Sequence, residues 1–232
     1  MKILMNNREI GYTYGSISGV YPFRKEKSIA YESPLERDFL ILLEFNDSVS
    51  DVIGQPLTLQ YKNQKGRTVP YSPDFLVYFH EPNAELLLPQ RKPLLIEVKP
   101  REKLIKEFSD YKYRFKQAIK YAYDNDMLFK IYDERKIRTQ YLSNIIFLKK
   151  YQNLVFNLDD ENKILSYLNI AGNTSVEYIL EYFCITREQK GIMLSLIWHL
   201  LSNKKILCHF NHPLNIQTQI WINENIEIEE IK

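Results

Sequence analysis

Residues 93–100 read Pro93-Leu94-Leu95-Ile96-Glu97-Val98-Lys99-Pro100, a short and mostly apolar run. This length and composition are typical of a strand buried at the centre of a sheet. Pro100 cannot donate a backbone hydrogen bond to a neighbouring strand, so the strand is expected to end there. Residues i and i+2 of a strand face the same side, and Glu97 and Lys99 are therefore expected to project together.

A second apolar run, residues 75–79, directly follows the pair Pro73-Asp74. Before it, residues 52–61 alternate in a strand pattern, and Asn63-Gln64-Lys65-Gly66 is a hairpin-turn signal. If the strand that follows Asp74 pairs with residues 93–100, the Asp74 side chain can reach the same point as Glu97 and Lys99.

Two converging carboxylates are costly unless a divalent cation neutralises them, and their hard oxygen atoms suit Mg²⁺ or Mn²⁺. A nearby Lys99 ammonium could orient or activate a water, or stabilise charge that builds on a phosphate. Asp74, Glu97 and Lys99 thus form the minimal site of a metal-dependent phosphodiester hydrolase. The alternative is an ordinary surface aspartate beside an edge-strand ion pair, although the apolar flanks weaken it.

A helix is predicted to begin after Ser33 and to end near Phe45. Ser33 is a good N-cap, Pro34 suits the first helical position, and Glu36 stands three residues after the cap. Glu36 has two possible roles: it stands at the position of a capping-box glutamate, and it could be a further acid of the site formed by Asp74 and Glu97.

Helical periodicity continues over residues 101–125, and residues 129–132 form a strand pattern. Residues 139–148 fit a helix or a strand, and the pattern does not choose between them. This order of elements predicts an α/β (α+β) fold, with a mixed sheet flanked by helices, over residues 1–150.

The character of the chain changes after Tyr151. Residues 159–168, 174–183 and 186–202 are predicted to be helices, and residues 205–210 and 217–222 to be strands. Three helices followed by a hairpin indicate a winged-helix module, so residues 151–232 are predicted to form a second domain.

Charge is spread unevenly behind a formal net charge of only +2. Residues 99–150 carry 14 Lys and Arg against 7 Asp and Glu, which indicates either a localised anionic partner or a solvated helix face. Residues 21–27 alternate aromatic and basic side chains and could follow a nucleic-acid backbone or form a plain surface arm. The candidate DNA-binding residues are Arg24, Lys25, Lys27, Arg101, Lys103 and Lys106.

The composition excludes several classes of protein. With 7 Gly, 10 Pro and 45% hydrophobic residues the chain is neither collagen-like nor disordered, and its 2 cysteines exclude a disulfide-dense scaffold. No run of about 18 apolar residues predicts a membrane span, and no signal peptide is recognised at the start. The expectation is a soluble intracellular protein. Cys208, His209 and His212 cluster in sequence but lack the four closing ligands of a structural zinc site.

Three segments together resemble the TnsA family, the endonuclease subunits of heteromeric bacterial cut-and-paste transposases. They are Glu32-Ser33-Pro34-Leu35-Glu36-Arg37-Asp38-Phe39, Tyr71-Ser72-Pro73-Asp74-Phe75-Leu76 and Ile96-Glu97-Val98-Lys99. The resemblance covers most of residues 20–150 by motif and the remainder by architecture. It implies a restriction-endonuclease-like catalytic domain joined to a C-terminal winged-helix domain.

The resemblance also implies roles for individual residues. Glu36 would be the helix acid, Asp74 the main metal ligand, Glu97 the second sheet ligand and Lys99 the catalytic lysine, with the carbonyl of Val98 as a further metal ligand. The best-known member of the family has glutamine in place of Glu97, whereas glutamate is commoner across the wider nuclease superfamily.

The family resemblance implies an activity and partners as well. The enzyme would cut the 5′ (non-transferred) strands of double-stranded DNA at transposon ends, together with a DDE-type (TnsB-like) transposase subunit and an AAA+ (TnsC-like) regulator. The acidic C-terminal part favours protein docking over DNA reading. The alternatives are a stand-alone restriction or repair nuclease of the same fold, and a DNA-binding adaptor whose site has decayed.

Overall fold

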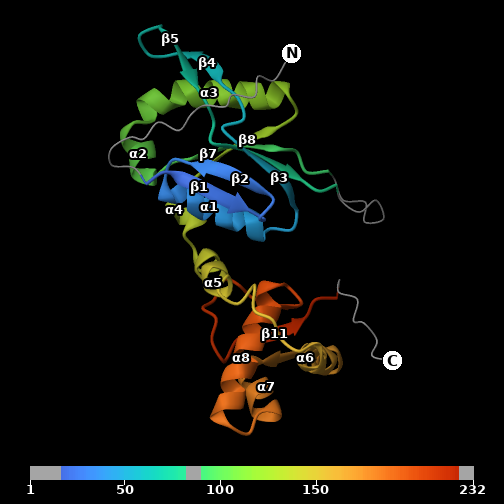
Figure 1. The fold of residues 1–232 in the computed structure, drawn as a ribbon. Helices are drawn as coiled ribbons and strands as arrows, with labels where there is room; N and C mark the ends of the chain where they lie inside the picture. Colours follow the sequence, from blue (N-terminus) through green and yellow to red (C-terminus); the bar gives the residue numbers. More distant parts are fainter. Residues whose placement is uncertain (1–16, 82–89, 225–232) are drawn as a thin grey trace. The chain divides into compact units, whose positions relative to one another are not determined.

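The chain is described here by a computed structural model that covers residues 17–81 and 90–224 (Figure 1). It divides into two compact units between Arg138 and Thr139. The division expected from the sequence lay after residue 150, so the two positions differ by the length of one short helix.

The first unit is built on a four-stranded mixed sheet. In spatial order its strands are β3 (Val49–Gly54), β6 (Phe75–Phe79), β7 (Leu94–Val98) and β8 (Leu128–Tyr132). β6 pairs antiparallel with β3 and β7, whereas β7 and β8 run parallel. The strand predicted at the centre of the sheet therefore lies at an interior position, with Leu95 and Ile96 fully buried.

Two helices cover opposite faces of this sheet (Figure 1). On one face lies α1 (Pro34–Phe45), whose Phe39 ring centroid is 4.7 Å from that of Tyr132. On the other lies α3 (Phe108–Asp124), whose Phe115 packs in one cluster with Leu95. The predicted α/β architecture, a mixed sheet flanked by helices of the restriction-endonuclease-like type, is confirmed.

The single strand expected over residues 52–61 is wrong. β3 ends at Gly54, Gln55 adopts a positive φ of 43°, and β4 begins only at Leu59. β4 (Leu59–Lys62) instead pairs with β5 (Thr68–Tyr71) in a separate hairpin. The predicted turn is present, with Gly66 at a φ of +73° that a side chain would strain.

The helix predicted over residues 101–125 is divided at Glu107 into α2 (Arg101–Lys106) and α3. Residues 21–27 lie in a hairpin of β1 (Gly19–Phe23) and β2 (Lys27–Tyr31). The short α4 (Glu134–Ile137) closes the unit.

The second unit combines helices with a small antiparallel sheet. Its elements are α5 (Gln140–Leu148), α6 (Leu158–Ala171), β9 (Asn173–Ser175), α7 (Val176–Phe183), α8 (Arg187–Ser202), β10 (Ile206–Cys208) and β11 (Gln219–Ile222). The strands lie in the order β10-β11-β9. The three predicted helices and two predicted strands are thus present, with β9 in addition.

Helix caps explain where two of these helices begin. Thr186 caps α8 and forms a capping box with Gln189. α7 is capped by Ser175, whose side chain accepts the Tyr178 N–H.

α5 belongs to the second unit because its apolar face is buried there. Leu148 is 1% exposed and packs in one cluster with Ile164 of α6, Ile179 of α7 and Ile197 of α8. This packing places the division of the chain before α5. In the described part of the chain, no helix has the length and apolarity needed to cross a bilayer.

Replacing Leu148 tests this division. Leu148→Ala leaves a cavity in the second core and is expected to lower the stability of that unit by about 2–5 kcal/mol. Amide hydrogen exchange should show faster exchange in α6 to α8 and unchanged protection of β6 and β7.

Ile146→Ala on the same helix is the matched control, because Ile146 is 42% exposed. Its effect should stay within about 0.5 kcal/mol. Loss of protection in β6 or β7 on Leu148→Ala would contradict the division.

Candidate active site

Pairing of β6 with β7 brings Asp74 to the end of the central strand. Phe75 lies opposite Ile96, and the Asp74 N–H donates to the Ile96 carbonyl at 2.9 Å. The Val98 N–H in turn donates to Asp74 Oδ2 at 2.6 Å. The backbone of β7 therefore fixes the carboxylate of Asp74 beside Val98.

Glu97 and Lys99 project together, as their spacing predicts. Lys99 Nζ lies 3.3 Å from Glu97 Oε1, and the Glu97 side chain is 1% exposed. The second oxygen, Oε2, accepts a hydrogen bond from the Tyr71 hydroxyl at 2.7 Å. Both oxygens of this buried carboxylate thus have partners, as a charge in this position requires.

Glu36 lies at the first turn of α1 and is buried. Its carboxylate accepts the Glu32 N–H and the Ser33 hydroxyl, both at 2.8 Å, while Ser33 Oγ accepts the Glu36 N–H at 3.2 Å. Ser33 thus caps α1, but Glu36 accepts the N–H of Glu32 and not that of the N-cap residue Ser33, so the reciprocal bond of a capping box is not formed. The charge of Glu36 also acts on Lys99 and Asp74, so Glu36 stands beside the other charged groups.

The cluster holds more negative than positive charge. Burial raises the pKa of the Asp74 carboxyl well above its usual range, the Glu97 charge raises it further, and Lys99 opposes both. Burial lowers the pKa of Lys99, but the three nearby carboxylates outweigh it, so the Lys99 pKa is raised overall. Lys99 is consequently charged at neutral pH, and ionised Asp74 is destabilised.

The donor set of the site suits a hard cation. Asp74 and Glu97 offer carboxylate oxygens, the ligand type that Mg²⁺ and Mn²⁺ prefer. Within residues 17–81 and 90–224, no three His, Cys, Asp or Glu side chains already gather around one point as a metal site. Metal binding by Glu36, Asp74, Glu97 and Val98 therefore stays a prediction.

Tyr71 was missed by the sequence reasoning. It ends β5, three residues before Asp74, and its hydroxyl reaches from the β4–β5 hairpin to Glu97 of β7 in the four-stranded sheet. Burial raises its pKa, and so does the charge of Glu97, so the hydroxyl stays protonated and donates. Its closeness in sequence to Pro73-Asp74 is the one signal that could have pointed to it.

The predicted DNA-binding residues of the first hairpin have partners within the chain. Arg24 and Lys25 occupy the β1–β2 turn with φ angles of 51° and 59°. The Arg24 guanidinium donates to the Asn46 carbonyl at 3.1 Å, and Lys27 forms an ion pair with Asp51.

Two of the three predicted DNA-binding residues of α2 also have partners within the chain. Arg101 lies 3.5 Å from Asp133 and Lys106 lies 2.5 Å from Glu102, while Lys103 is exposed. Asp133 is buried, whereas Lys106 and Glu102 are both exposed. DNA contact by Arg101, Lys103 and Lys106 stays a prediction.

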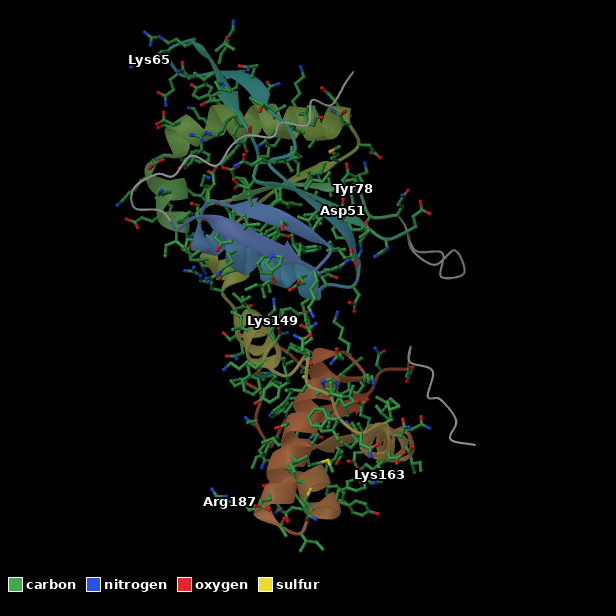
Figure 2. The ribbon with its side chains drawn as sticks, in the orientation of Figure 1. Asp51, Lys65, Tyr78, Lys149, Lys163 and Arg187 are labelled. Atoms are coloured by element: carbon green, nitrogen blue, oxygen red, sulfur yellow. The ribbon has the colours of Figure 1, made fainter. Side chains whose placement is uncertain are left out.

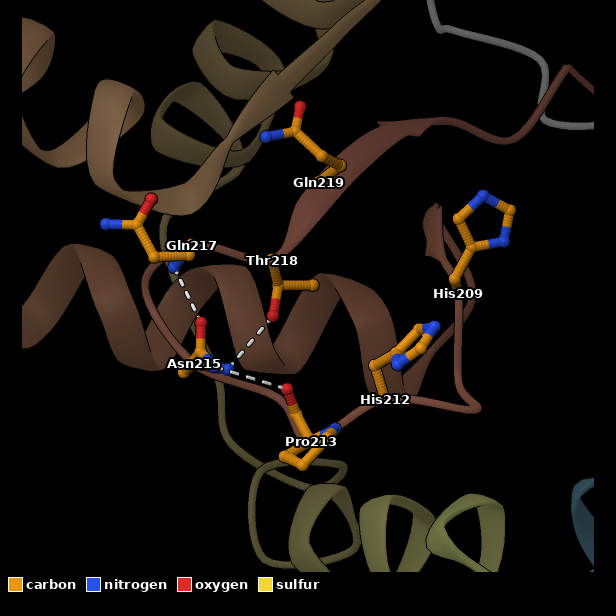
Figure 3. Close-up of a pocket in the computed structure, with 7 residues that line it drawn as sticks. All are labelled: His209, His212, Pro213, Asn215, Gln217, Thr218 and Gln219. Carbon is orange, nitrogen blue, oxygen red and sulfur yellow. Dashed lines mark hydrogen bonds between the residues drawn. The ribbon is translucent and has the colours of Figure 1, made fainter.

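The Cys208, His209 and His212 cluster does not converge. Cys208 is buried, which raises the pKa of its thiol to about 12. His209 and His212 line a pocket of about 270 Å³ formed mainly by the loop that joins β10 to β11, shown in Figure 3. The His209 ring lies 5.0 Å from the Trp221 ring, so packing accounts for its position.

Comparison with known protein families gives two consecutive matches. Residues 46–134 match the model described as TnsA-like endonuclease N terminal, and residues 136–209 match that described as TnsA endonuclease C terminal. The chain belongs to the TnsA endonuclease family. Among curated proteins none gives a significant match.

The matched segments bear on the site. The TnsA N-terminal segment contains Asp74, Glu97 and Lys99, whereas Glu36 precedes it. The two TnsA segments meet close to the structural division at Arg138 and Thr139. The resemblance inferred from the sequence is therefore confirmed at the level of the family.

The raised pKa of Asp74 predicts a pH-dependent stability. The folded state binds the Asp74 proton more tightly than the unfolded chain, so stability falls as pH rises above the usual aspartate pKa. Asp74→Asn cannot ionise and keeps an oxygen for the Val98 N–H. In denaturant titrations with a chelator, this variant should be more stable than the unchanged protein at pH 7.

The difference in stability between Asp74→Asn and the unchanged protein should shrink toward zero as the pH is lowered to the usual pKa of an aspartate. Asp124→Asn, at an exposed position at the end of α3, is the control and should show no such trend. An equal difference between Asp74→Asn and the unchanged protein at pH 4 and pH 7 would contradict the prediction.

Proposed function

We propose that the chain is the metal-dependent DNA endonuclease subunit of a transposase, and that it cuts the 5′ (non-transferred) strands at transposon ends. Membership of the TnsA family supports the class of activity. The observation that carries the chemistry is the convergence of Asp74, Glu97 and Lys99 at the end of β7.

In this proposal Asp74 and Glu97 hold Mg²⁺ or Mn²⁺, with Glu36 and the carbonyl of Val98 as further ligands. The cation would supply Lewis-acid activation and offset charge on the phosphate. Lys99, which is charged because the three acids raise its pKa, donates to an oxygen of the phosphate or orients the attacking water.

The reaction is hydrolysis of one phosphodiester bond. Water supplies the oxygen that bonds to phosphorus, the phosphorus–oxygen bond to the leaving sugar breaks, and the proton of the water passes to solvent or to the leaving oxygen. Tyr71 donates to Glu97 throughout and keeps that carboxylate in place.

The second unit is proposed to be a winged-helix module that docks proteins. Its order of helix, strand, helix, helix, strand, strand is the one that such a module requires. α8 carries only two basic residues before His199, and one of them, Lys190, is paired with Glu181. A DNA-reading helix would be more basic, so a TnsB-like transposase subunit and a TnsC-like AAA+ regulator are the proposed partners in the bacterial cytoplasm.

Two substitutions test the activity. Asp74→Ala and Lys99→Ala should each lower 5′-strand cleavage by about 10²-fold or more, because each removes a group that acts on the transition state. Cleavage is mapped by strand on duplexes that carry transposon ends, with the partner subunits and Mg²⁺ present.

Asp124→Ala and Lys130→Ala, both at exposed positions of the first unit, are the matched controls and should cut normally. Circular dichroism establishes that the variants fold. Normal 5′ cutting by Asp74→Ala or Lys99→Ala would refute the proposed site. Strong cutting of plain duplex without partners would favour a stand-alone nuclease instead.

The cation is tested separately. Calorimetry with Mg²⁺ or Mn²⁺ should show binding to the unchanged protein that is lost in Asp74→Ala and unaltered in Asp124→Ala. If no metal binding depends on Asp74, the nuclease proposal is wrong, and the chain is a DNA-binding adaptor without a working site.

A further inference from the structure

The turn of the β4–β5 hairpin concentrates positive charge. Lys62, Lys65 and Arg67 are exposed there, and residues 57–73 contain no acidic residue. Figure 2 labels Lys65 at the tip of this hairpin, which lies over α3 and extends past it. In the part of the chain that the structure covers, no carboxylate lies within ion-pair distance of these three cations.

The hairpin is held in a defined shape. The Asn63 side chain accepts the N–H groups of Lys65 and Arg67, each at 3.0 Å, so the turn is closed from inside. Gln64 donates to Asp110 of α3 at 3.0 Å and fastens the turn to the helix. The three cations therefore extend from a preorganised support, which lowers the entropy cost of binding.

The base of the hairpin reaches the acid cluster. Tyr71, the last residue of β5, donates to Glu97, and Asp74 follows three residues later. Arg67 precedes Tyr71 by four positions, which at about 3.3 Å per residue places the turn roughly 13 Å along the strand. A DNA duplex rises about 3.4 Å per base pair, so this span corresponds to about four base pairs.

Arg114 of α3 lies near Tyr71, the last residue of β5 at the base of the hairpin. Its guanidinium carbon is 4.4 Å from the Tyr111 ring centroid and 5.8 Å from that of Tyr71. Its Nε is buried and has no hydrogen-bond partner among the described residues. Aromatic faces stabilise a cation without occupying its N–H donors, and the planar guanidinium matches a phosphate.

We propose that Arg114 and the hairpin residues Lys62, Lys65 and Arg67 form a phosphate-binding track that leads away from the acid cluster. The inference rests on the proposed nuclease function and names how its substrate is held. The partner is the sugar-phosphate backbone of duplex DNA, bound without regard to sequence. Arg114 contacts the phosphate nearer the cleaved bond, and the turn contacts phosphates about four base pairs away.

Three of the candidate DNA-binding residues differ from this track. Arg101, Lys106 and Lys27 each face a carboxylate of the chain. A cation that already has a carboxylate partner must give it up to bind phosphate, whereas the track residues have none among the described residues. The track is therefore expected to contribute more to DNA binding than those residues do.

The test measures DNA binding without cleavage. The triple variant Lys62→Gln/Lys65→Gln/Arg67→Gln and the single variant Arg114→Gln are titrated against a fluorescent duplex with a chelator, at several salt concentrations. A plot of the logarithm of the DNA association constant against the logarithm of the salt concentration has a negative slope, and each lost phosphate contact reduces the size of that slope by about 0.9. The slope should therefore become smaller by about 2.7 in the triple variant and by about 0.9 in Arg114→Gln. The control is Lys130→Gln/Lys163→Gln/Arg187→Gln, which removes equal charge at exposed positions elsewhere and should keep the slope.

A second measurement locates the contact. Neutral methylphosphonate linkages about four base pairs from the cleaved bond should weaken binding by the unchanged protein and leave the triple variant unaffected. Equal effects on both proteins, equal loss of slope in the control, or absence of DNA binding by the unchanged protein would overturn the track.

Cleavage separates the track from the function on which it rests. Track-dependent binding without metal-dependent cutting would retain the track and refute the nuclease. If cutting needs Asp74 but the track variants bind DNA as tightly as the unchanged protein, the track is refuted and the nuclease function is retained.

Discussion

The antiparallel pairing of β6 with β7 is the constraint on which the first unit depends. It places Asp74 against the Val98 N–H and gives both strands two buried faces, one under α1 and one under α3. A slip of one residue would turn Glu97 away from Tyr71 and exchange the faces on which Leu95 and Ile96 pack, so the bond to the buried Glu97 carboxylate favours a single register. The geometry of the site thus follows from the packing of the core.

Sequence reasoning succeeded where local chemistry and long-range packing agree. β7 was predicted because its residues are apolar on both faces, and α1 because Ser33 and Pro34 mark its start. It failed at Gln55, since a positive φ at a residue other than glycine has no signature in the sequence. The placement of α5 was missed for a similar reason, because only tertiary contacts show which core receives Leu148.

Charge totals concealed a local feature. Residues 1–98 are close to neutral as a block, yet the block contains both the acids Glu36, Asp74 and Glu97 and the cations of the β4–β5 turn. When the charges of residues 1–98 are summed, the acids and the cations cancel. In the structure, the β4–β5 hairpin carries the cations at its turn, away from the acids. α2 contributed three of the candidate DNA-binding residues because it is rich in cations. Two of these, Arg101 and Lys106, have carboxylate partners in the chain.

Three carboxyl groups act on one lysine at the proposed site, and full ionisation of all three would leave an excess of negative charge. Such a site repels a phosphate until a cation offsets the acids, while the phosphate itself supplies oxygens that a cation prefers. Thermodynamic linkage then requires each of the two to raise the affinity of the site for the other by the same factor. Glu36 holds the Glu32 N–H and the Ser33 hydroxyl at the first turn of α1, so a cation bound by Glu36 would also act on the start of that helix.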